Sequence, residues 1–181
     1  FFENYQKMKI IETNFNGLKI FKKQTFNDKR GYTRELFLSR SINKKFPFDI
    51  LTFSKKNVLR GLHLQIKKPQ GKFITVLKGK IYDVSVDCRK NSKTFGKYFS
   101  ILLSEKENNS IFIPEGFAHG YCVLSDSCLM HYKMTNYRDK KLERGINWND
   151  KFIDIKWPIK KPIVSVRDKK NISFKEYIKL K

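Results

Sequence analysis

The chain has 181 residues, of which 40% are hydrophobic and 14% aromatic, enough to bury one full core and too many for a disordered polypeptide. No stretch reaches the roughly 20 apolar residues that span a bilayer, so no membrane partner is expected. The formal charge of +22 comes mostly from lysines spread along the whole chain, without a basic arm. This distribution favours a diffusely charged surface over a nucleic-acid partner, and it is compatible with electrostatic attraction of a phosphorylated ligand.

The alternation of apolar and polar residues predicts strands through most of the chain. In chain order we expect strands over 17–22, 49–54, 73–77, 81–86, 98–103, 110–113, 120–124 and 128–134, with a turn at Gly79 that makes a hairpin of the third and fourth. A short helical turn is expected over 41–46, and a terminal helix over 173–180 with Ser173 near its cap. Short strands at this spacing predict one all-β domain, a sandwich or barrel, over residues 8–181. Residues 1–7 are expected to be a cloning remnant or a loose arm, because Met8 resembles a natural start.

The cysteines Cys88, Cys122 and Cys128 are odd in number and lack CxxC spacing. A disulfide scaffold or a zinc site is therefore not expected. Cys88 and Cys122 lie in apolar runs and are predicted to be small buried hydrophobic residues. A reducing compartment is the simplest setting, so we expect the protein to be cytoplasmic.

The three histidines are the first candidates for chemistry. His63 lies in Arg60-Gly-Leu-His-Leu-Gln65, and if residues 61–65 form a strand, His63 and Gln65 face the mouth of the barrel together. Imidazole titrates near neutral pH and can remove a proton from carbon, provided that a positive group stabilises the enolate oxygen. Lys72 or Arg60 can supply that charge, although each can equally be an ordinary surface cation.

His119 ends the run Pro114-Glu-Gly-Phe-Ala-His119, which resembles the second metal motif of cupins. The first cupin motif requires His-x-His and a following Glu, whereas this chain offers His63-Leu-Gln65. Two histidines and a glutamine are a poor site for a divalent metal, so no metal is predicted and His119 is expected to bind a ligand. No glycine-rich dinucleotide fingerprint is present, and no other cofactor is expected.

Two further residues are candidates on weaker grounds. Tyr132 and His131 are neighbours on a predicted strand, so only one of them can enter a cavity. A tyrosine that faces His63 would be a suitable acid for inversion, since one group removes the proton and another returns it from the opposite side. Asp168 follows an apolar stretch and either orients His63 or serves as a turn or cap residue.

By the order and spacing of these residues and of the segments around them, the chain resembles the dTDP-4-dehydrorhamnose 3,5-epimerases and the 3,5-epimerases of other nucleotide sugars. The resemblance extends from Met8 to about Lys170. It rests on the segments 28–35, 58–63, 70–72, 83–87, 92–96, 113–120, 132–133 and 143–150.

The resemblance implies a double-stranded β-helix, the cupin jelly roll, in a metal-free homodimer that epimerises a nucleotide-diphosphate sugar for surface polysaccharide synthesis. It implies that His63 is the base, Asp168 its partner, Tyr132 the acid and Lys72 the group that stabilises the enolate. Arg60 and His119 would hold the sugar and the diphosphate. The remaining positions that match the nucleotide-sugar site are Arg30, Glu35, Glu143 and Arg167. Arg30 and Glu35 would act across the dimer interface.

Two departures from the family occur in the ligand-binding region. Phe48 and Ile50 replace a Gln-x-Asn pair, and Arg138 replaces a second tyrosine that stacks on thymine in the family. An arginine can also stack on a base and donates a fork of hydrogen bonds. We therefore hypothesise that the chemistry is kept but that the substrate is a GDP-linked 4-keto-6-deoxy sugar, with a heptose as one form.

Three other functions were weighed: a metal-dependent cupin, a non-enzymatic binding module, and a cupin ketoisomerase that moves the keto group. The first lacks a third strong ligand in the sequence. The second leaves the set of His63, Lys72, Tyr132 and Asp168 unexplained. The Tyr132 position argues against the third by analogy alone, and the sequence leaves open whether C3, C5 or both are inverted.

Overall fold

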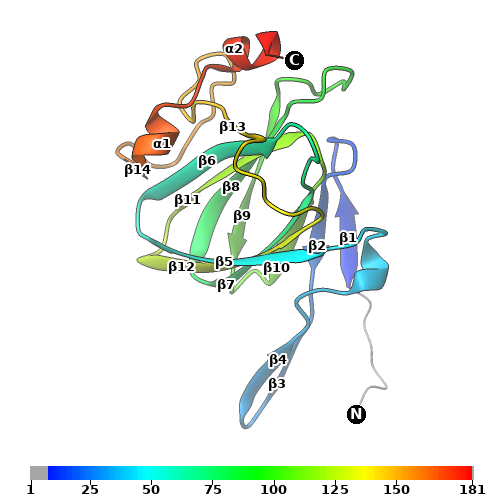
Figure 1. Ribbon diagram of the computed structural model, residues 1–181. Coiled ribbons are helices and arrows are strands. Elements are labelled where there is room, and N and C mark those ends of the chain that lie inside the picture. Colours follow the sequence, from blue (N-terminus) through cyan, green and yellow to red (C-terminus); the bar gives the residue numbers. More distant parts are fainter. Residues whose placement is uncertain (1–7, 181) are drawn as a thin grey trace.

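Two β-sheets packed face to face form the body of the molecule, with the C-terminal segment across one end (Figure 1). The computed structural model describes residues 8–180, so the expectation for residues 1–7 falls outside the described part. The first sheet contains, in spatial order, β1 (Lys9–Glu12), β2 (Lys19–Lys22), β10 (Asn109–Ile113), β7 (Lys72–Lys78), β12 (Ser127–Met134) and β5 (Phe48–Lys55). The second contains β13 (Glu143–Gly145), β6 (Val58–Gln65), β11 (Phe117–Val123), β8 (Lys80–Asp87) and β9 (Tyr98–Ser104), with β14 (Ile163–Val164) beside β6.

The order of the strands makes this sandwich a jelly roll. Strands that follow each other in the chain often lie in different sheets: β6 and β7 are on opposite sides, as are β11 and β12. The pairs within each sheet are antiparallel, except for the parallel pair of β14 and β6. The fold is the predicted cupin-type double-stranded β-helix.

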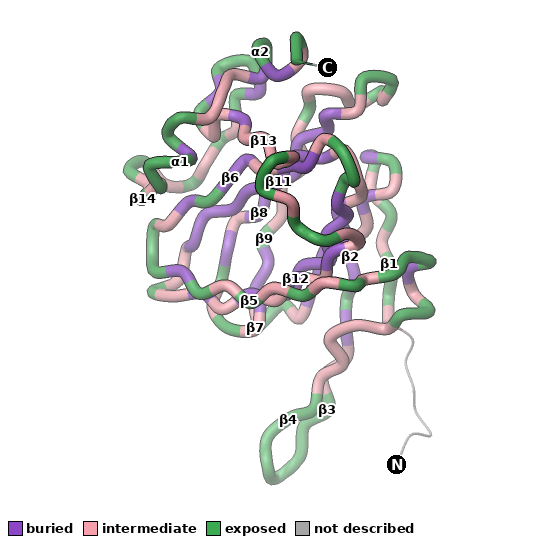
Figure 2. The backbone as a smooth tube through the Cα atoms, in the orientation of Figure 1, coloured by how far each residue is buried: buried purple, intermediate pink, exposed green. Residues whose placement is uncertain are grey.

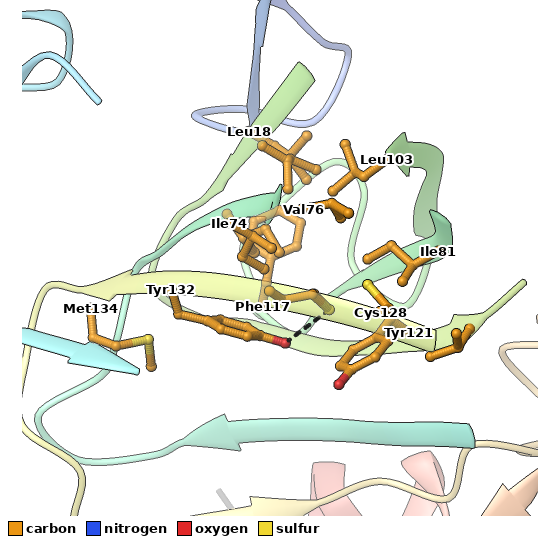
Figure 3. Close-up of a cluster of buried hydrophobic side chains, with 14 of the residues drawn as sticks. Leu18, Ile74, Val76, Ile81, Leu103, Phe117, Tyr121, Cys128, Tyr132 and Met134 are labelled. Atoms are coloured by element: carbon orange, nitrogen blue, oxygen red, sulfur yellow. Dashed lines mark hydrogen bonds between the residues drawn. The ribbon is translucent and has the colours of Figure 1, made fainter. Parts of the chain in front are cut away.

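The side chains between the sheets form the main hydrophobic core. Its members come from both sheets and include Ile74, Val76, Leu103, Phe117 and Tyr132 (Figure 3). Figure 2 shows that the buried residues follow the central strands, whereas exposed residues lie at the sheet edges and loops. Because strand residues alternate between the two faces, the same pattern brings Tyr132 inside and leaves His131 outside.

Two parts of the chain extend from this body. The hairpin of β3 (Thr25–Asp28) and β4 (Gly31–Arg34) projects away from the sheets and is largely exposed (Figures 1 and 2). At the opposite end, α1 (Val166–Lys169) and α2 (Phe174–Lys179) lie in the C-terminal segment, next to the second sheet. Phe174 and Tyr177 of α2 are buried in a second core on the outer face of that sheet. This packing fixes the position of α1, which supplies one residue of the site.

The predicted strands are all present, and so is the hairpin turn at Gly79, where φ is +89° and a Cβ would collide with the Ser127 carbonyl oxygen. The terminal helix begins at Ser173, whose side chain and that of Glu176 form a capping box. The predicted helical turn over 41–46 is wrong: a 3₁₀ turn, η1, covers Ser39–Ser41, and Ile42 is already extended. Pro47 disfavours a helical conformation at Phe46, so the helix could not continue there.

Cys88 and Cys122 are buried, as expected, and so is Cys128. Within residues 8–180, none of the helices is long and apolar enough to cross a membrane.

Candidate active site

A cavity of about 550 Å³ opens between the two sheets at the end covered by β13, β14 and α1. His63, Lys72, His119, Tyr132 and Asp168 all line it. They come from five different elements, β6, β7, β11, β12 and α1. The fold therefore gathers residues that are spread over more than 100 positions of the chain.

His63 and Asp168 form the closest contact in the cavity. The His63 Nε2 atom lies 2.6 Å from Asp168 Oδ1, and Asp168 Oδ2 also accepts the backbone N–H of Gly61 at 3.3 Å. Burial of the Asp168 carboxyl raises its pKa, but the hydrogen bond and charge of His63 outweigh this and lower the pKa below its usual range. With Nε2–H donated to the carboxylate, Nδ1 is the nitrogen that can accept a proton. Asp168 thus orients His63, and it also belongs to α1, where the Ser165 side chain caps its N–H.

Lys72 is the buried cation of the site. Its side chain is 7% exposed, and its Nζ donates to the backbone oxygen of His63 at 3.0 Å. Burial lowers the pKa of Lys72 to about 8, against the nearby Asp83 and Glu143 carboxylates, which raise it. The ammonium form is therefore still the main form at neutral pH. Of the two cations considered from the sequence, both line the cavity, but Lys72 is buried whereas Arg60 is exposed.

His119 lies opposite His63 in the ladder between β11 and β6. Its Nε2 is 2.7 Å from Oδ2 of Asp83, and both side chains are almost fully buried. Burial lowers the pKa of His119, whereas Asp83 raises it, and the net direction is down. A neutral imidazole results, with one nitrogen occupied by Asp83.

Tyr132 faces this group from the other sheet. Its ring centroid is 6.0 Å from that of His119, and burial raises the pKa of its hydroxyl well above the usual value. The phenol therefore holds its proton at neutral pH and can give it up only to a strong base such as a carbanion or enolate. Figure 3 shows its hydroxyl directed toward the Tyr121 side chain, and the same hydroxyl lies 4.0 Å from the sulfur of Met130. His131, as expected for the neighbouring position, points to the outer face and pairs with Asp49.

A cluster of charged side chains lies at the mouth of the cavity. Glu143 accepts hydrogen bonds from both Arg138 and Arg167. Burial raises the pKa of Glu143, but the two guanidinium groups outweigh it and lower the pKa to about 2. All three residues line the cavity, and the fork of Arg138 is committed to Glu143 rather than lying free for stacking on a base.

Arg60 also lines the cavity, and its Nε donates to the Ser54 hydroxyl, which in turn lies 3.1 Å from the Tyr121 hydroxyl. The expectation that Gln65 faces the barrel mouth is wrong. Its side-chain amide instead donates to the Lys68 carbonyl and accepts from the backbone N–H of Asp139, which fixes two loops. The Gln65 amide is therefore held by backbone groups of these loops and does not enter the cavity.

The first departure from the family, Phe48 and Ile50, lies at an apolar part of the site. Ile50 lines it together with Met134 of the neighbouring strand, and Phe48 packs against Tyr137, with ring centroids 6.1 Å apart. Tyr137 is 67% exposed. Through Ile50 and Met134, one wall of the cavity therefore offers apolar contact surface.

Arg30 and Glu35 do not reach the cavity of their own chain. Arg30 is at the tip of the β3–β4 hairpin and pairs with Asp28, and Glu35 directly follows β4 (Figure 1). Tyr121 lines the cavity and Asp83 pairs with His119, although neither was predicted as a residue of the site. Asp83 could have been noticed as the one charged residue within the apolar run 81–86.

Metal ligands do not cluster in the described residues: no three or more His, Cys, Asp or Glu side chains converge there. His63 and His119 are each paired with their own aspartate.

Comparison with known proteins identifies the family of the chain. The family model described as dTDP-4-dehydrorhamnose 3,5-epimerase matches residues 12–176. The dTDP-4-dehydrorhamnose 3,5-epimerase of Shigella flexneri is 42% identical over 168 residues, which cover 89% of this chain and 93% of the relative. That of Methanothermobacter thermautotrophicus is 40% identical over 158 residues, with 84% and 85% covered.

Solved structures agree as well. The dTDP-4-dehydrorhamnose 3,5-epimerase of Bacillus anthracis, with TDP and PPi bound, superposes with a TM-score of 0.90 at 36% identity, covering 93% of this chain and 100% of that chain. The dTDP-6-deoxy-D-glucose-3,5-epimerase of Legionella pneumophila, in complex with dTDP-4-keto-L-rhamnose, has a TM-score of 0.89 at 36% identity, with 92% and 93% covered. The chain therefore belongs to the dTDP-4-dehydrorhamnose 3,5-epimerase family, whose members are isomerases of the cupin jelly-roll fold.

Proposed function

We propose that this chain epimerises a nucleotide-diphosphate 4-keto-6-deoxy sugar at C3, C5 or both, as a step in deoxysugar synthesis for a surface polysaccharide. One observation supports this most strongly. An imidazole oriented by a carboxylate, His63, and a fully protonated phenol, Tyr132, lie on opposite sheets of one cavity that also contains the Lys72 ammonium. Inversion at carbon requires a base and an acid on opposite sides of the reacting atom.

In the first step, Nδ1 of His63 takes the proton from the carbon next to the keto group. The electron pair of the C–H bond moves into the ring and onto the carbonyl oxygen, which forms an enolate. Lys72 donates a hydrogen bond to this oxygen, and in a buried site a fixed cation stabilises such charge strongly. Asp168 stabilises the imidazolium that results, because its carboxylate is 2.6 Å from Nε2.

In the second step, Tyr132 donates its phenolic proton to the opposite face of the same carbon, and the carbonyl re-forms. The raised pKa of the phenol suits this order of events, since the proton stays on oxygen until a strongly basic carbon is presented. His63 then releases its proton and Tyr132 regains one through solvent. A second round at the other carbon next to the ketone needs the same residues.

The nucleotide and diphosphate would occupy the charged mouth of the cavity. Arg60 is exposed there, and Arg138 and Arg167 flank Glu143, so the mouth has three guanidinium groups for one carboxylate. Bidentate donors of this kind favour phosphate oxygens. His119 would hold a sugar hydroxyl.

The identity of the nucleotide base is the part of the substrate that differs between two predictions. The names of the relatives favour dTDP, and the bound TDP in the Bacillus anthracis structure is of that class. The apolar wall of Ile50 and Met134 and the Arg138 position favour a different substrate, for which GDP-linked sugars, heptoses among them, remain our prediction. Calorimetry with dTDP and GDP decides this: tighter binding of dTDP refutes the GDP assignment.

We further propose a homodimer in which Arg30 and Glu35 complete the cavity of the partner. The hairpin that ends in Arg30 projects from the body, and its Phe26 and Tyr32 are 39% and 60% exposed. Mixing tests this. Arg30→Ala and His63→Ala homodimers should each be inactive, and subunit exchange between them should restore activity in mixed dimers. No restoration would place Arg30 outside the partner's site. A cytoplasmic location likewise stays a prediction.

Solvent deuterium incorporation tests the reaction itself. Wild type and His63→Ala are incubated in heavy water with dTDP- and GDP-linked 4-keto-6-deoxy sugars, and the products are analysed by NMR. Deuterium at C3, C5 or both, absent with His63→Ala, is the expected result and identifies the carbons and the nucleotide together. A shifted keto group instead would indicate a ketoisomerase, and metal-dependent incorporation would indicate a metal cupin.

A further inference from the structure

Asp83 is a buried carboxylate within the catalytic cluster, although it does not line the cavity. It lies on β8, is 1% exposed, and is the partner of His119 through Oδ2 at 2.7 Å. Its second oxygen, Oδ1, is buried without a hydrogen-bond partner among the described residues, as is the hydroxyl of Ser85, two positions further on the same face of the strand. A buried carboxylate with half of its acceptors unused is costly unless nearby cations stabilise it.

Lys72 is a buried cation whose pKa Asp83 raises. The Lys72 ammonium donates a hydrogen bond to the His63 carbonyl. Asp83 raises the pKa of Lys72 more than Glu143 does. Charged and titratable groups surround Lys72 from the packed strands: His63 on β6, Asp83 on β8, His119 on β11, Tyr132 on β12 and Glu143 on β13. Two arginines already neutralise Glu143, whereas the ion-pair partner of Asp83 among the described residues is His119 and not a lysine or arginine.

We propose that Asp83 is a positioning residue with two linked roles: it keeps the Nε2 proton of His119 directed away from the substrate, and it keeps Lys72 in the ammonium form. The first role follows from the hydrogen bond, because a carboxylate accepts and so requires a donor at Nε2. Nδ1 of His119 then has a lone pair that accepts a hydrogen bond from a substrate hydroxyl. The second role follows from the burial of Lys72, which by itself favours the neutral amine.

This inference rests on the proposed function for its kinetic part, because only an enolate needs the Lys72 ammonium. Activity should fall as the pH rises through about 8, where Lys72 loses its proton. Removal of a negative charge near an ammonium favours the neutral amine. In Asp83→Asn the alkaline limb of kcat for deuterium incorporation should therefore move to lower pH, by about one unit or more.

The controls separate this effect from a general loss of structure. Ser85→Ala removes a neighbouring buried polar group without a charge and should leave the alkaline limb in place. Lys72→Arg should abolish the limb, since a guanidinium stays protonated. If folded Asp83→Asn keeps the wild-type limb, the charge role is wrong. Should Asp83→Asn fail to fold, Asp83→Ser is measured in the same way.

The tautomer role has a readout that needs no substrate. The chain has three histidines, so long-range ¹H–¹⁵N spectra of the imidazoles can be assigned with His63→Ala and His131→Ala. Wild-type His119 should be protonated at Nε2, whereas a proton at Nδ1 alone would refute this role. If wild type incorporates no deuterium at any pH, the proposed function fails, and this spectrum still decides how Asp83 holds His119.

Discussion

Asp168→Asn tests the core of the proposed mechanism with a change of one atom. Asparagine has the same shape, and its Oδ1 can still accept the Gly61 N–H, so the fold should lose about 1 kcal/mol or less. The amide, however, can turn its NH₂ group toward Nε2 of His63. The imidazole then accepts there and places its own proton on Nδ1, where the base should be.

The expected loss is large because the base is then in the wrong tautomer. Correctly placed general bases accelerate reactions by roughly 10²–10⁴-fold, which corresponds to about 2.7–5.4 kcal/mol of transition-state stabilisation. The 2.6 Å contact and the near-complete burial of Asp168 favour the upper half of this range. The assay is the rate of deuterium incorporation at C3 and C5, followed by NMR.

Asp49→Asn is the matched control. Asp49 pairs with His131 at 3.1 Å on the outer face of the first sheet, so the same chemical change is made away from the cavity. Its rate should stay at the wild-type level. A folded Asp168→Asn variant that incorporates deuterium as fast as Asp49→Asn would show that Asp168 does not orient the base.

Three further expectations follow. Tyr132→Phe should still incorporate deuterium, since His63 can return a deuteron to the face it deprotonated, but inversion should be lost; inverted product from this variant would exclude Tyr132 as the acid. Asp87 has a pKa lowered to about 2, by hydrogen bonds that outweigh burial, so its contribution to stability is present above pH 3.8 and is lost as the pH falls toward about 2. Asp87→Ala should reduce the free energy of unfolding by about 2–4 kcal/mol at pH 7, measured by urea titration, because Arg89 and two hydroxyls lose their acceptor. The loss of stability of the wild type between pH 3.8 and about 2 should be smaller in this variant. A free energy of unfolding equal to that of the wild type at pH 7 would contradict this. Gly79→Ala should lower the unfolding midpoint, because its φ of +89° and the Ser127 carbonyl exclude a Cβ.

The strands of the body could be predicted from the sequence because their apolar alternation is a local property. Residues 73–77 and 81–86 with Gly79 between them show the pattern clearly, and the structure has β7 and β8 there. The projecting hairpin of β3 and β4 was not predicted as strands, because its exposed residues alternate without an apolar face. The helical turn was misplaced because Phe37 and Phe46 pack on each other, a tertiary contact that propensity does not reveal.

The candidate site divides in the same way. The residue types of His63, Lys72 and Tyr132 suggested proton transfer at carbon, and the order of the motifs resembled one family. The sequence alone could not tell Lys72 from Arg60, because burial decides which cation meets an enolate. Asp83 was overlooked as a candidate, because its partner His119 is 36 positions away. The predicted orientation of Gln65 was wrong because its amide forms hydrogen bonds with the backbone of neighbouring loops.

The sequence was sufficient to predict an all-β domain and a set of side chains suited to inversion beside a ketone, since composition, alternation and residue chemistry are local. Which of these side chains share a cavity depends on how the two sheets and the C-terminal segment pack together. Asp168 meets His63 across 105 positions because α1 is held against β6 by the C-terminal segment, and Tyr132 faces them because β12 belongs to the other sheet. Burial in that shared space, rather than sequence proximity, keeps the Tyr132 phenol protonated and lowers the pKa of the Lys72 ammonium to about 8.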